Sequence, residues 1–120
     1  ANFGVRTTEI AKKIGIDEAI MLNHICFWCS LNKKNNSQRH LHEGAYWTYF
    51  SRRELIEFFG FWSESQVRRI LDRLVRYEYL RKGRFNRKGY DKTSWYTPSP
   101  RMTIFYAENS QPEVGIDHPW

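Results

Sequence analysis

Two helix-start signals that follow each other closely constrain the fold of this chain more than any other feature. Ser51 with Glu54, and then Ser63 with Gln66, each form a capping box, in which the two side chains bond N–H groups left unpaired where a helix starts. Gly60 lies between the two boxes, and a glycine is a common end of a helix. The sequence therefore predicts a short helix that ends at this glycine, a tight turn, and a second helix.

The second of these helices, over 63–78, has one apolar and one polar face. Its apolar residues recur at the three- and four-residue spacings of a helix packed on one side: Val67, Ile70, Leu71, Leu74 and Val75. At about 100° per residue, the outward positions are Ser65, Arg69, Asp72 and Arg76, with Gln66 and Arg73 on one flank and Arg68 on the other. Two short helices joined by a tight turn, the second presenting arginines, match a helix-turn-helix motif.

A hairpin rich in positive charge is predicted directly after these helices. The segments 80–85 (LRKGRF) and 93–98 (TSWYTP) have the composition of short strands, and the glycine-bearing loop 86–92 (NRKGYDK) joins them. The whole chain carries 19 Lys and Arg against 13 Asp and Glu, a formal net charge of +6, which favours a polyanionic partner. The hairpin concentrates this positive charge, because its one acidic residue is Asp91. Its basic residues are Arg81, Lys82, Arg84, Arg87, Lys88 and Lys92.

The first half of the chain predicts two helices and a strand. The segment 7–15 (TTEIAKKIG), with Thr7 as its cap, predicts a short helix. A longer helix over 17–33 has apolar side chains in nearly every direction, so it is expected to be buried on most sides. Because a small domain rarely covers a helix all round, we expect one of its faces to contact a second copy. The polar stretch 33–44 predicts an exposed loop, and 46–50 (YWTYF) a short strand.

The order of these elements predicts one α+β domain over 5–100. We expect a winged helix-turn-helix that is mostly helical, with a small antiparallel sheet and the basic hairpin as its wing. A chain of 120 residues, 41% of them hydrophobic, has room for one compact core of this kind. The tail 101–120 is acidic towards its end and is expected to be extended or mobile. With no membrane-spanning run and no signal-peptide pattern in the sequence, we expect a cytoplasmic protein.

Three stretches of the chain resemble a known family. They are KIGIDEAIMLNHICFW (13–28), YWTYFSRRELIEFFGFWSESQVRRILDRLVRYEYL (46–80) and RFNRKGYDKTSWY (84–96). They are similar to the winged-helix domain of phage and mobile-element replication proteins, and to the DnaD-like amino-terminal domains of replisome organisers and helicase loaders. The family often has a histidine and an aromatic where Cys26 and Phe27 stand. The resemblance implies a winged-helix fold, and domains of this kind bind DNA, form oligomers, or do both.

We therefore predict that the domain binds double-stranded DNA and catalyses no reaction. Helix 63–78 would enter the major groove, and the wing, 81–92, would follow the phosphate backbone or the minor groove. A phosphate would also be held at the amino end of the first helix of the pair, where N–H groups point outward. The predicted contacts to base edges are Ser65, Gln66 and Arg69, those to phosphates are Arg52, Arg53, Arg68 and Arg73, and those of the wing are Arg84, Arg87, Lys88 and Lys92.

The role expected for such a module is replication initiation of a phage, plasmid or integrated element. Helix 17–33 would join a homodimer or higher oligomer, and a replicative helicase or another replication protein would be a further partner. Two alternatives use the same fold. One is a protein-interaction or oligomerisation domain of a replisome-assembly protein, which the apolar helix 17–33 and the acidic tail favour. The other is a transcriptional regulator, which needs the same groove chemistry.

Other functional patterns in the sequence are weaker. Cys26 and Cys29, with His40 and His42, have a two-plus-two arrangement that suits zinc, but both cysteines fall within an apolar helix, where a buried thiol is expected. The sequence has no glycine-rich phosphate loop, nucleophile elbow or metal-binding helix motif, so we expect no catalysis, cofactor or metal. Three tryptophans near element boundaries are expected to pack in the core rather than to stack on unpaired bases: Trp47, Trp62 and Trp95.

Overall fold

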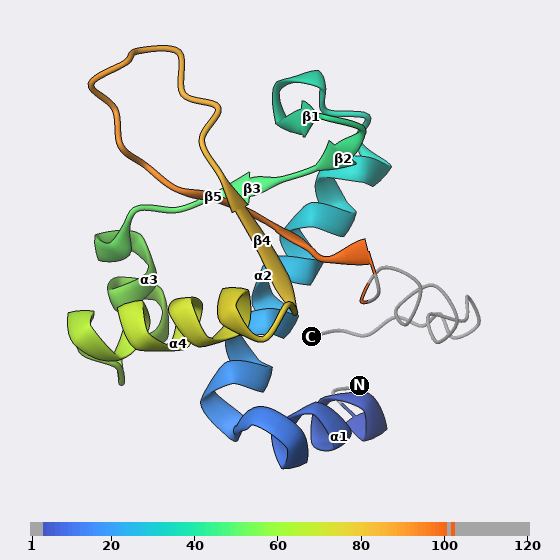
Figure 1. The fold of residues 1–120 in the computed structure, drawn as a ribbon, viewed down its shortest axis with the longest axis vertical. Coiled ribbons are helices and arrows are strands. Elements are labelled where there is room, and N and C mark those ends of the chain that lie inside the picture. The colour runs from blue at the N-terminus through green and yellow to red at the C-terminus, as the bar shows by residue number, and fades with distance from the viewer. Residues whose placement is uncertain (1–3, 101, 103–120) are drawn as a thin grey trace.

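The computed structural model describes residues 4–100 and 102, with side chains from residue 7 onward. Four helices and two small antiparallel sheets make up this part of the chain (Figure 1). In chain order the elements are α1 (Gly4–Ile14), α2 (Ile16–Lys34), the 3-10 helix η1 (Gln38–His40), β1 (Leu41–His42), β2 (Ala45–Tyr46), β3 (Thr48–Tyr49), α3 (Arg52–Phe59), α4 (Glu64–Arg76), β4 (Leu80–Gly83) and β5 (Trp95–Pro98).

The larger sheet joins strands that lie far apart in the sequence. β5 is its central strand and pairs antiparallel with β3 on one side and with β4 on the other. The register places both Thr48 and Lys82 opposite Tyr96. β1 and β2 form a separate two-stranded hairpin. The predicted α+β class with a small antiparallel sheet is confirmed, and the arrangement is compatible with a winged-helix-like fold.

The hydrophobic core lies where α2 meets α4 and the sheet. In Figure 1, α2 passes behind the sheet, α4 runs across below the sheet and in front of α2, and α1 folds against the start of α2. The apolar face predicted for 63–78 is buried here, together with one side of α2. The fully buried side chains of the two helices are Met21, Leu22 and Ile25 of α2 and Val67, Ile70 and Leu74 of α4.

Both predicted capping boxes are present and fix where α3 and α4 begin. The Ser51 N–H donates to Glu54 Oε1 at 2.8 Å, and the Glu54 N–H donates to Ser51 Oγ at 3.0 Å. Ser63 and Gln66 repeat this exchange at 2.8 and 3.2 Å. Gly60, with a φ of 75°, ends α3 in the left-handed conformation that glycine adopts most readily. The two helices and the turn between them therefore follow directly from local sequence.

Several predicted boundaries are wrong. The first helix begins at Gly4, so Thr7 is a buried residue within α1 and does not cap it. The predicted strand 46–50 is divided, because Trp47 lies between β2 and β3 with its ring in the core. The predicted loop 33–44 contains η1 and β1. The helix predicted over 63–78 ends at Arg76, and Glu78 takes a left-handed φ of 66°.

The predicted tail 101–120 lies outside the described residues, apart from Met102. Met102 is part of the core, and its N–H donates to the Ser99 carbonyl at 2.9 Å. Met102 therefore packs with the core of the domain, although it lies past the predicted boundary at residue 100.

Candidate nucleic-acid interface

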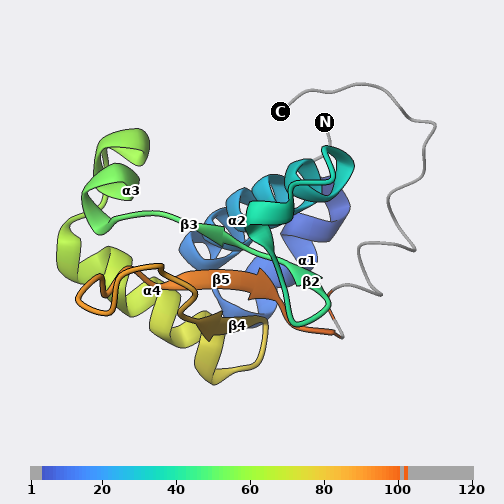
Figure 2. The same ribbon diagram turned by 90° about the horizontal axis from the view of Figure 1, so that it is seen from above.

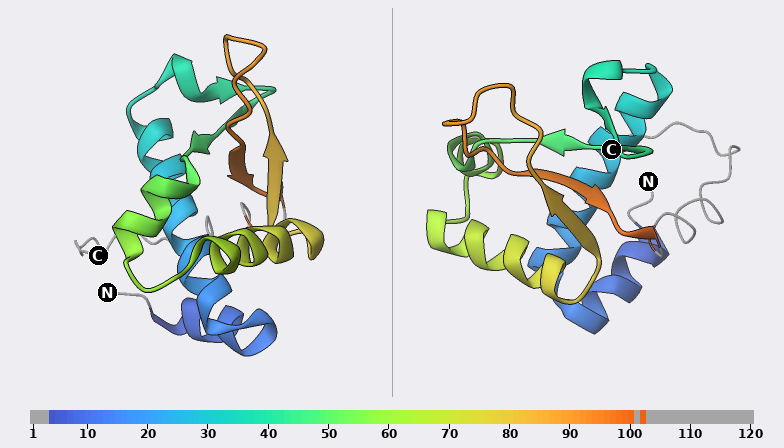
Figure 3. Two further views of the ribbon diagram at one scale, coloured as in Figure 1. Left: turned by 90° about the vertical axis from the view of Figure 1, so that its left-hand side faces the viewer. Right: turned by 45° about the horizontal axis from the view of Figure 1, so that its top comes forward.

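The loop 84–94, between β4 and β5, projects from the sheet on the same side of the molecule as α4. Figures 1 and 2 show it extending from the ends of β4 and β5 towards the side where α3 and the amino end of α4 lie. The left panel of Figure 3 shows the loop and α4 together, with β4 running between them and α2 behind. A long anionic ligand lying along this side would meet both segments.

Asn86 holds the base of the loop together. Its Nδ2 donates to the carbonyls of Asp91 and Thr93 at 2.9 and 2.8 Å, and its Oδ1 accepts from Trp95 Nε1 at 2.7 Å. The Asp91 carboxylate accepts from the Thr93 N–H at 3.0 Å, and this bond holds the pKa of Asp91 below its usual range. The sequence analysis did not identify Asn86, although an asparagine is a typical turn residue and this one opens the glycine-bearing loop 86–92.

The loop is anchored by aromatic packing. Phe85 stacks on His42 with ring centroids 4.3 Å apart, and it contacts Trp47 at 4.8 Å and Trp95 at 5.7 Å. The β1–β2 hairpin thus supports the loop from one side. Beyond this anchor the predicted cations of the loop are exposed, as is Tyr90, which is 76% exposed and lies 5.8 Å from the Lys88 ammonium. The exposed cations are Arg84, Arg87, Lys88 and Lys92.

On α4, the structure divides the predicted contact residues into two groups. Ser65, Arg68 and Arg69 are exposed on the outer side of the helix. Gln66 is partly buried, and its side-chain oxygen accepts from the Ser63 N–H in the capping box, so that oxygen is occupied in the folded domain. Among the residues that the structure describes, the ion pairs join Arg52 to Glu64, Arg73 to Glu18, and Arg81 to Glu43. Arg68, Arg69 and the cations of the loop take part in none of them.

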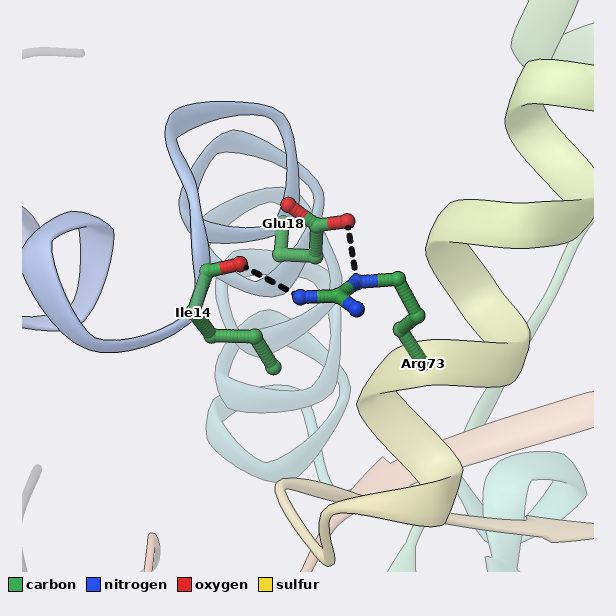
Figure 4. Close-up of polar contacts among 3 residues, drawn as sticks. All are labelled: Ile14, Glu18 and Arg73. Atoms are coloured by element: carbon green, nitrogen blue, oxygen red, sulfur yellow. Dashed lines mark hydrogen bonds and ion pairs between the residues drawn. The ribbon is translucent and has the colours of Figure 1, made fainter.

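Contrary to the prediction from the sequence, Arg73 does not point outward to meet a phosphate, because its guanidinium is bonded within the domain. Its Nε donates to Glu18 Oε2 at 2.9 Å, and its Nη2 donates to the Ile14 carbonyl at 2.9 Å (Figure 4). The Glu18 side chain is 9% exposed, so the guanidinium neutralises a nearly buried carboxylate. Arg73 therefore ties α4 to the junction of α1 and α2, and it is not grouped with the exposed cations.

The two arginines at the start of α3 are both exposed. Arg52 Nη1 lies 3.6 Å from Glu64 Oε2, and both side chains are at least half exposed, so this ion pair contributes little to stability. Arg53 points to solvent on the first turn of the helix. Either side chain is accessible to a phosphate, and the phosphate contact itself stays a prediction.

The structure does not bring the zinc candidates together. Cys26 and Cys29 are buried thiols, as predicted; Cys29 Sγ lies 3.5 Å from the Tyr96 carbonyl, and burial raises its pKa to about 12. His40 and His42 lie elsewhere, bonded to Ser37 Oγ and to the Arg39 carbonyl. Within residues 4–100 and 102, no three His, Cys, Asp or Glu residues are grouped as metal ligands would be. The predicted core packing of the three tryptophans is confirmed, with Trp47, Trp62 and Trp95 at 2 to 5% exposed.

His24, on α2, lies among aromatic rings of α2 and α3. Its ring is 4.8 Å from Phe58 and 4.9 Å from Phe59, and burial lowers its pKa to about 4. The unfolded chain binds this proton near pH 6.5, whereas the folded domain binds it only near pH 4. The neutral His24 therefore does not lower the free energy of unfolding above about pH 7. As the pH falls from 7 towards 4, protonation of the unfolded chain lowers that free energy.

We accordingly expect His24→Gln to be less sensitive to acid than the wild type. Because the ring is partly exposed, the difference in unfolding free energy between pH 7 and pH 4.5 should shrink by about 1–2 kcal/mol. Urea unfolding of both proteins at the two pH values measures this. Equal pH dependence of the two proteins would show that the ring is protonated freely in the folded domain.

No protein-family model, curated protein or solved structure matches this chain. Among the described helices, none is long and apolar enough to cross a bilayer.

Proposed function

We propose that this domain binds duplex DNA as a winged helix-turn-helix. In this assignment α3 and α4 are the two helices of the motif, and the loop 84–94 is the wing. The observation that carries the proposal is that α4 and the loop 84–94, which lie at the two ends of β4 in the left panel of Figure 3, both carry exposed cations, and that hydrogen bonds of Asn86 close the base of the loop. Exposed cations on two elements of this kind are what a phosphate backbone requires.

Within this proposal α4 is the recognition helix. An α-helix with its side chains is about 10–12 Å across, which fits the roughly 12 Å width of the major groove. Ser65 and Arg69, on the outer side, are the side chains placed to reach base edges, and a guanidinium there suits the O6 and N7 acceptors of guanine. Arg68, on the flank of the same helix, is placed for a phosphate.

The wing would supply affinity that does not depend on sequence. Its four cations project from a loop that Asn86 closes and Phe85 anchors, so little ordering is needed when it meets the backbone. Arg52 and Arg53 would add phosphate contacts beside α4. Binding should therefore weaken steeply with salt, since each neutralised phosphate releases condensed counterions.

The two parts of this surface should respond differently to alanine substitution. Arg69→Ala is expected to cost about 1–3 kcal/mol on a preferred sequence and to reduce the preference for it. Lys88→Ala should weaken binding to all duplexes about equally and lower the salt slope by about one. Fluorescence anisotropy with random and selected duplexes of about 20 base pairs, repeated over a salt series, measures both.

Lys12→Ala on α1 is the matched control, because it removes the same charge from an exposed position far from the loop. An Arg69→Ala protein with unchanged affinity and unchanged preference would contradict the placement of α4 in the groove. Absence of wild-type binding to any duplex at low salt would overturn the DNA-binding proposal as a whole.

The resemblance to phage and mobile-element replication proteins supports a role in replication initiation in the cytoplasm. A transcriptional regulator would use the same surface. A comparison of the affinity for replication-origin fragments with the affinity for promoter fragments separates these two roles. A role in replisome assembly is favoured by a separate observation, the exposed aromatic side chains of α2 and α3.

A further inference from the structure

A line of aromatic rings crosses the surface formed by α2 and α3. Trp28 has its ring 5.5 Å from Phe27 and 6.4 Å from His24. His24 in turn lies 4.8 Å from Phe58, and Phe59 continues the line to Phe61 at 5.9 Å. The members with substantial exposure are Phe27, Trp28, Phe58 and Phe61, and together with His24 they are called the aromatic face below.

The aromatic face exposes an amount of apolar surface that suits the centre of a protein interface. Phe27 and Trp28 are 42% and 37% exposed, and Phe58 and Phe61 are 67% and 62% exposed. At 150–250 Å² for each aromatic side chain, this amounts to about 400 Å². A stable interface buries roughly 600–1,000 Å² on each partner. The aromatic face therefore supplies about half of the area that such an interface needs, and the side chains around it would supply the rest.

The α2 part of this surface carries no formal charge. Residues 19–32 include no Asp, Glu, Lys or Arg, and burial keeps the imidazole of His24 neutral at pH 7 by lowering its pKa to about 4. The chain as a whole has a net charge of +6, so two copies repel each other over most of their surface. The repulsion between two copies is weakest where their uncharged α2 surfaces meet. A strongly charged partner would find no opposite charge on this surface.

The aromatic face is also separate from α4 and the loop 84–94, and it shares only α3 with the proposed phosphate contacts Arg52 and Arg53. In Figure 2, α3 and the carboxyl-terminal half of α2 lie above the sheet, whereas α4 and the loop 84–94 lie level with it or below it. The left panel of Figure 3 agrees, with α2 and α3 on one side and α4 and the loop on the other. A protein bound to the aromatic face would leave α4 and the loop 84–94 open.

We propose that the aromatic face is the contact surface between two copies of this chain. A two-fold contact places the same patch on both partners, so rings meet rings and no charge is buried without a partner. The sequence predicted self-association through helix 17–33; the structure narrows the surface to the second half of α2 and adds Phe58 and Phe61 from outside that helix. The proposal does not depend on DNA binding.

Sedimentation equilibrium of the DNA-free protein, from about 1 to 300 μM, tests the proposal. The wild type should pass from the 14.5 kDa chain mass to twice that value as its concentration rises. The dimer should persist at 0.5 M salt, because apolar contacts are not screened. A wild type that stays monomeric at every concentration would overturn the proposal, whatever the outcome of the DNA measurements.

Variants of exposed side chains locate the contact. The double variant Phe27→Ser/Phe58→Ser should raise the dimer dissociation constant at least about tenfold, since aromatic side chains dominate such interfaces. Both side chains are exposed, so the variant should fold, and circular dichroism checks this. Ile16→Ser is the matched control, because Ile16 is 61% exposed at the other end of α2; it should leave the dissociation constant within about twofold.

Two further outcomes would overturn the proposal. A dimer whose dissociation constant is the same in the folded double variant as in the wild type would place the contact elsewhere. If the full chain stays monomeric and the chain without residues 103–120 dimerises, this segment of the same chain, and not a second copy, covers the aromatic face of the wild type.

Discussion

Replacing Arg73 with alanine should lower the free energy of unfolding by about 2–3 kcal/mol, the largest loss of stability expected from any exposed or half-exposed cation of α4. Two groups lose their partner at once: the Glu18 carboxylate, whose side chain is 9% exposed, and the Ile14 carbonyl at the end of α1. For a domain of about 100 residues, the midpoint of thermal unfolding should fall by roughly 10 °C.

Two variants define the cause of this loss. Arg69→Ala removes the same side chain from an exposed position of the same helix, and its unfolding free energy should stay within about 0.5 kcal/mol of the wild type. Arg73→Lys keeps the charge but cannot donate from two guanidinium nitrogens, so it should recover only part of the stability. A loss below about 0.5 kcal/mol in Arg73→Ala would show that the contact with Glu18 contributes nothing in solution.

Arg73 also shows where inference from the sequence reaches its limit. The helical period placed this residue on the flank of α4, which is its position in the structure. Its partner Glu18 is 55 positions away in the chain, so no local pattern could associate the two. An arginine beside exposed arginines on a helix was therefore predicted to contact phosphate, whereas tertiary packing gives it a structural role.

The elements set by local chemistry were the ones that the sequence predicted best. The capping boxes at Ser51 and Ser63 and the glycine at position 60 determine α3, the turn and the start of α4 within a few residues. By contrast, β1 and β2 are strands of two residues each, which is too short for a periodicity to be detected. Contacts made in the folded domain hold these two strands in place. One of them is the hydrogen bond that Trp47 Nε1 donates to the His42 carbonyl at 2.9 Å.

The aromatic face was predictable only in part. A helix with apolar side chains in every direction indicates that one side lacks a cover within a small domain, and α2 does expose Phe27 and Trp28. Which side is uncovered depends on how α4 and the sheet pack against α2, and the contribution of α3 depends on the turn at Gly60. Neither is encoded in the period of α2 itself.

Reversing the charge of the wing should produce the largest loss of DNA affinity. The variant Lys88→Glu/Lys92→Glu replaces two exposed ammonium groups with carboxylates beside the proposed path of the phosphates. It loses the counterion release of two contacts and adds like-charge repulsion, which together should cost about 3 kcal/mol, or roughly 100-fold in Kd at 0.15 M salt. Anisotropy with a random duplex of about 20 base pairs measures this.

The matched variant Lys12→Glu/Lys13→Glu separates contact from net charge. It changes the formal charge of the chain by the same amount, on two exposed residues at the end of α1. Figure 1 places α1 at the opposite end of the molecule from the loop 84–94. Since charges beyond about 8 Å are largely screened at 0.15 M salt, this variant should lose less than about threefold in Kd. Equal losses in the two variants would mean that DNA is attracted by the overall charge and that the loop is not a wing.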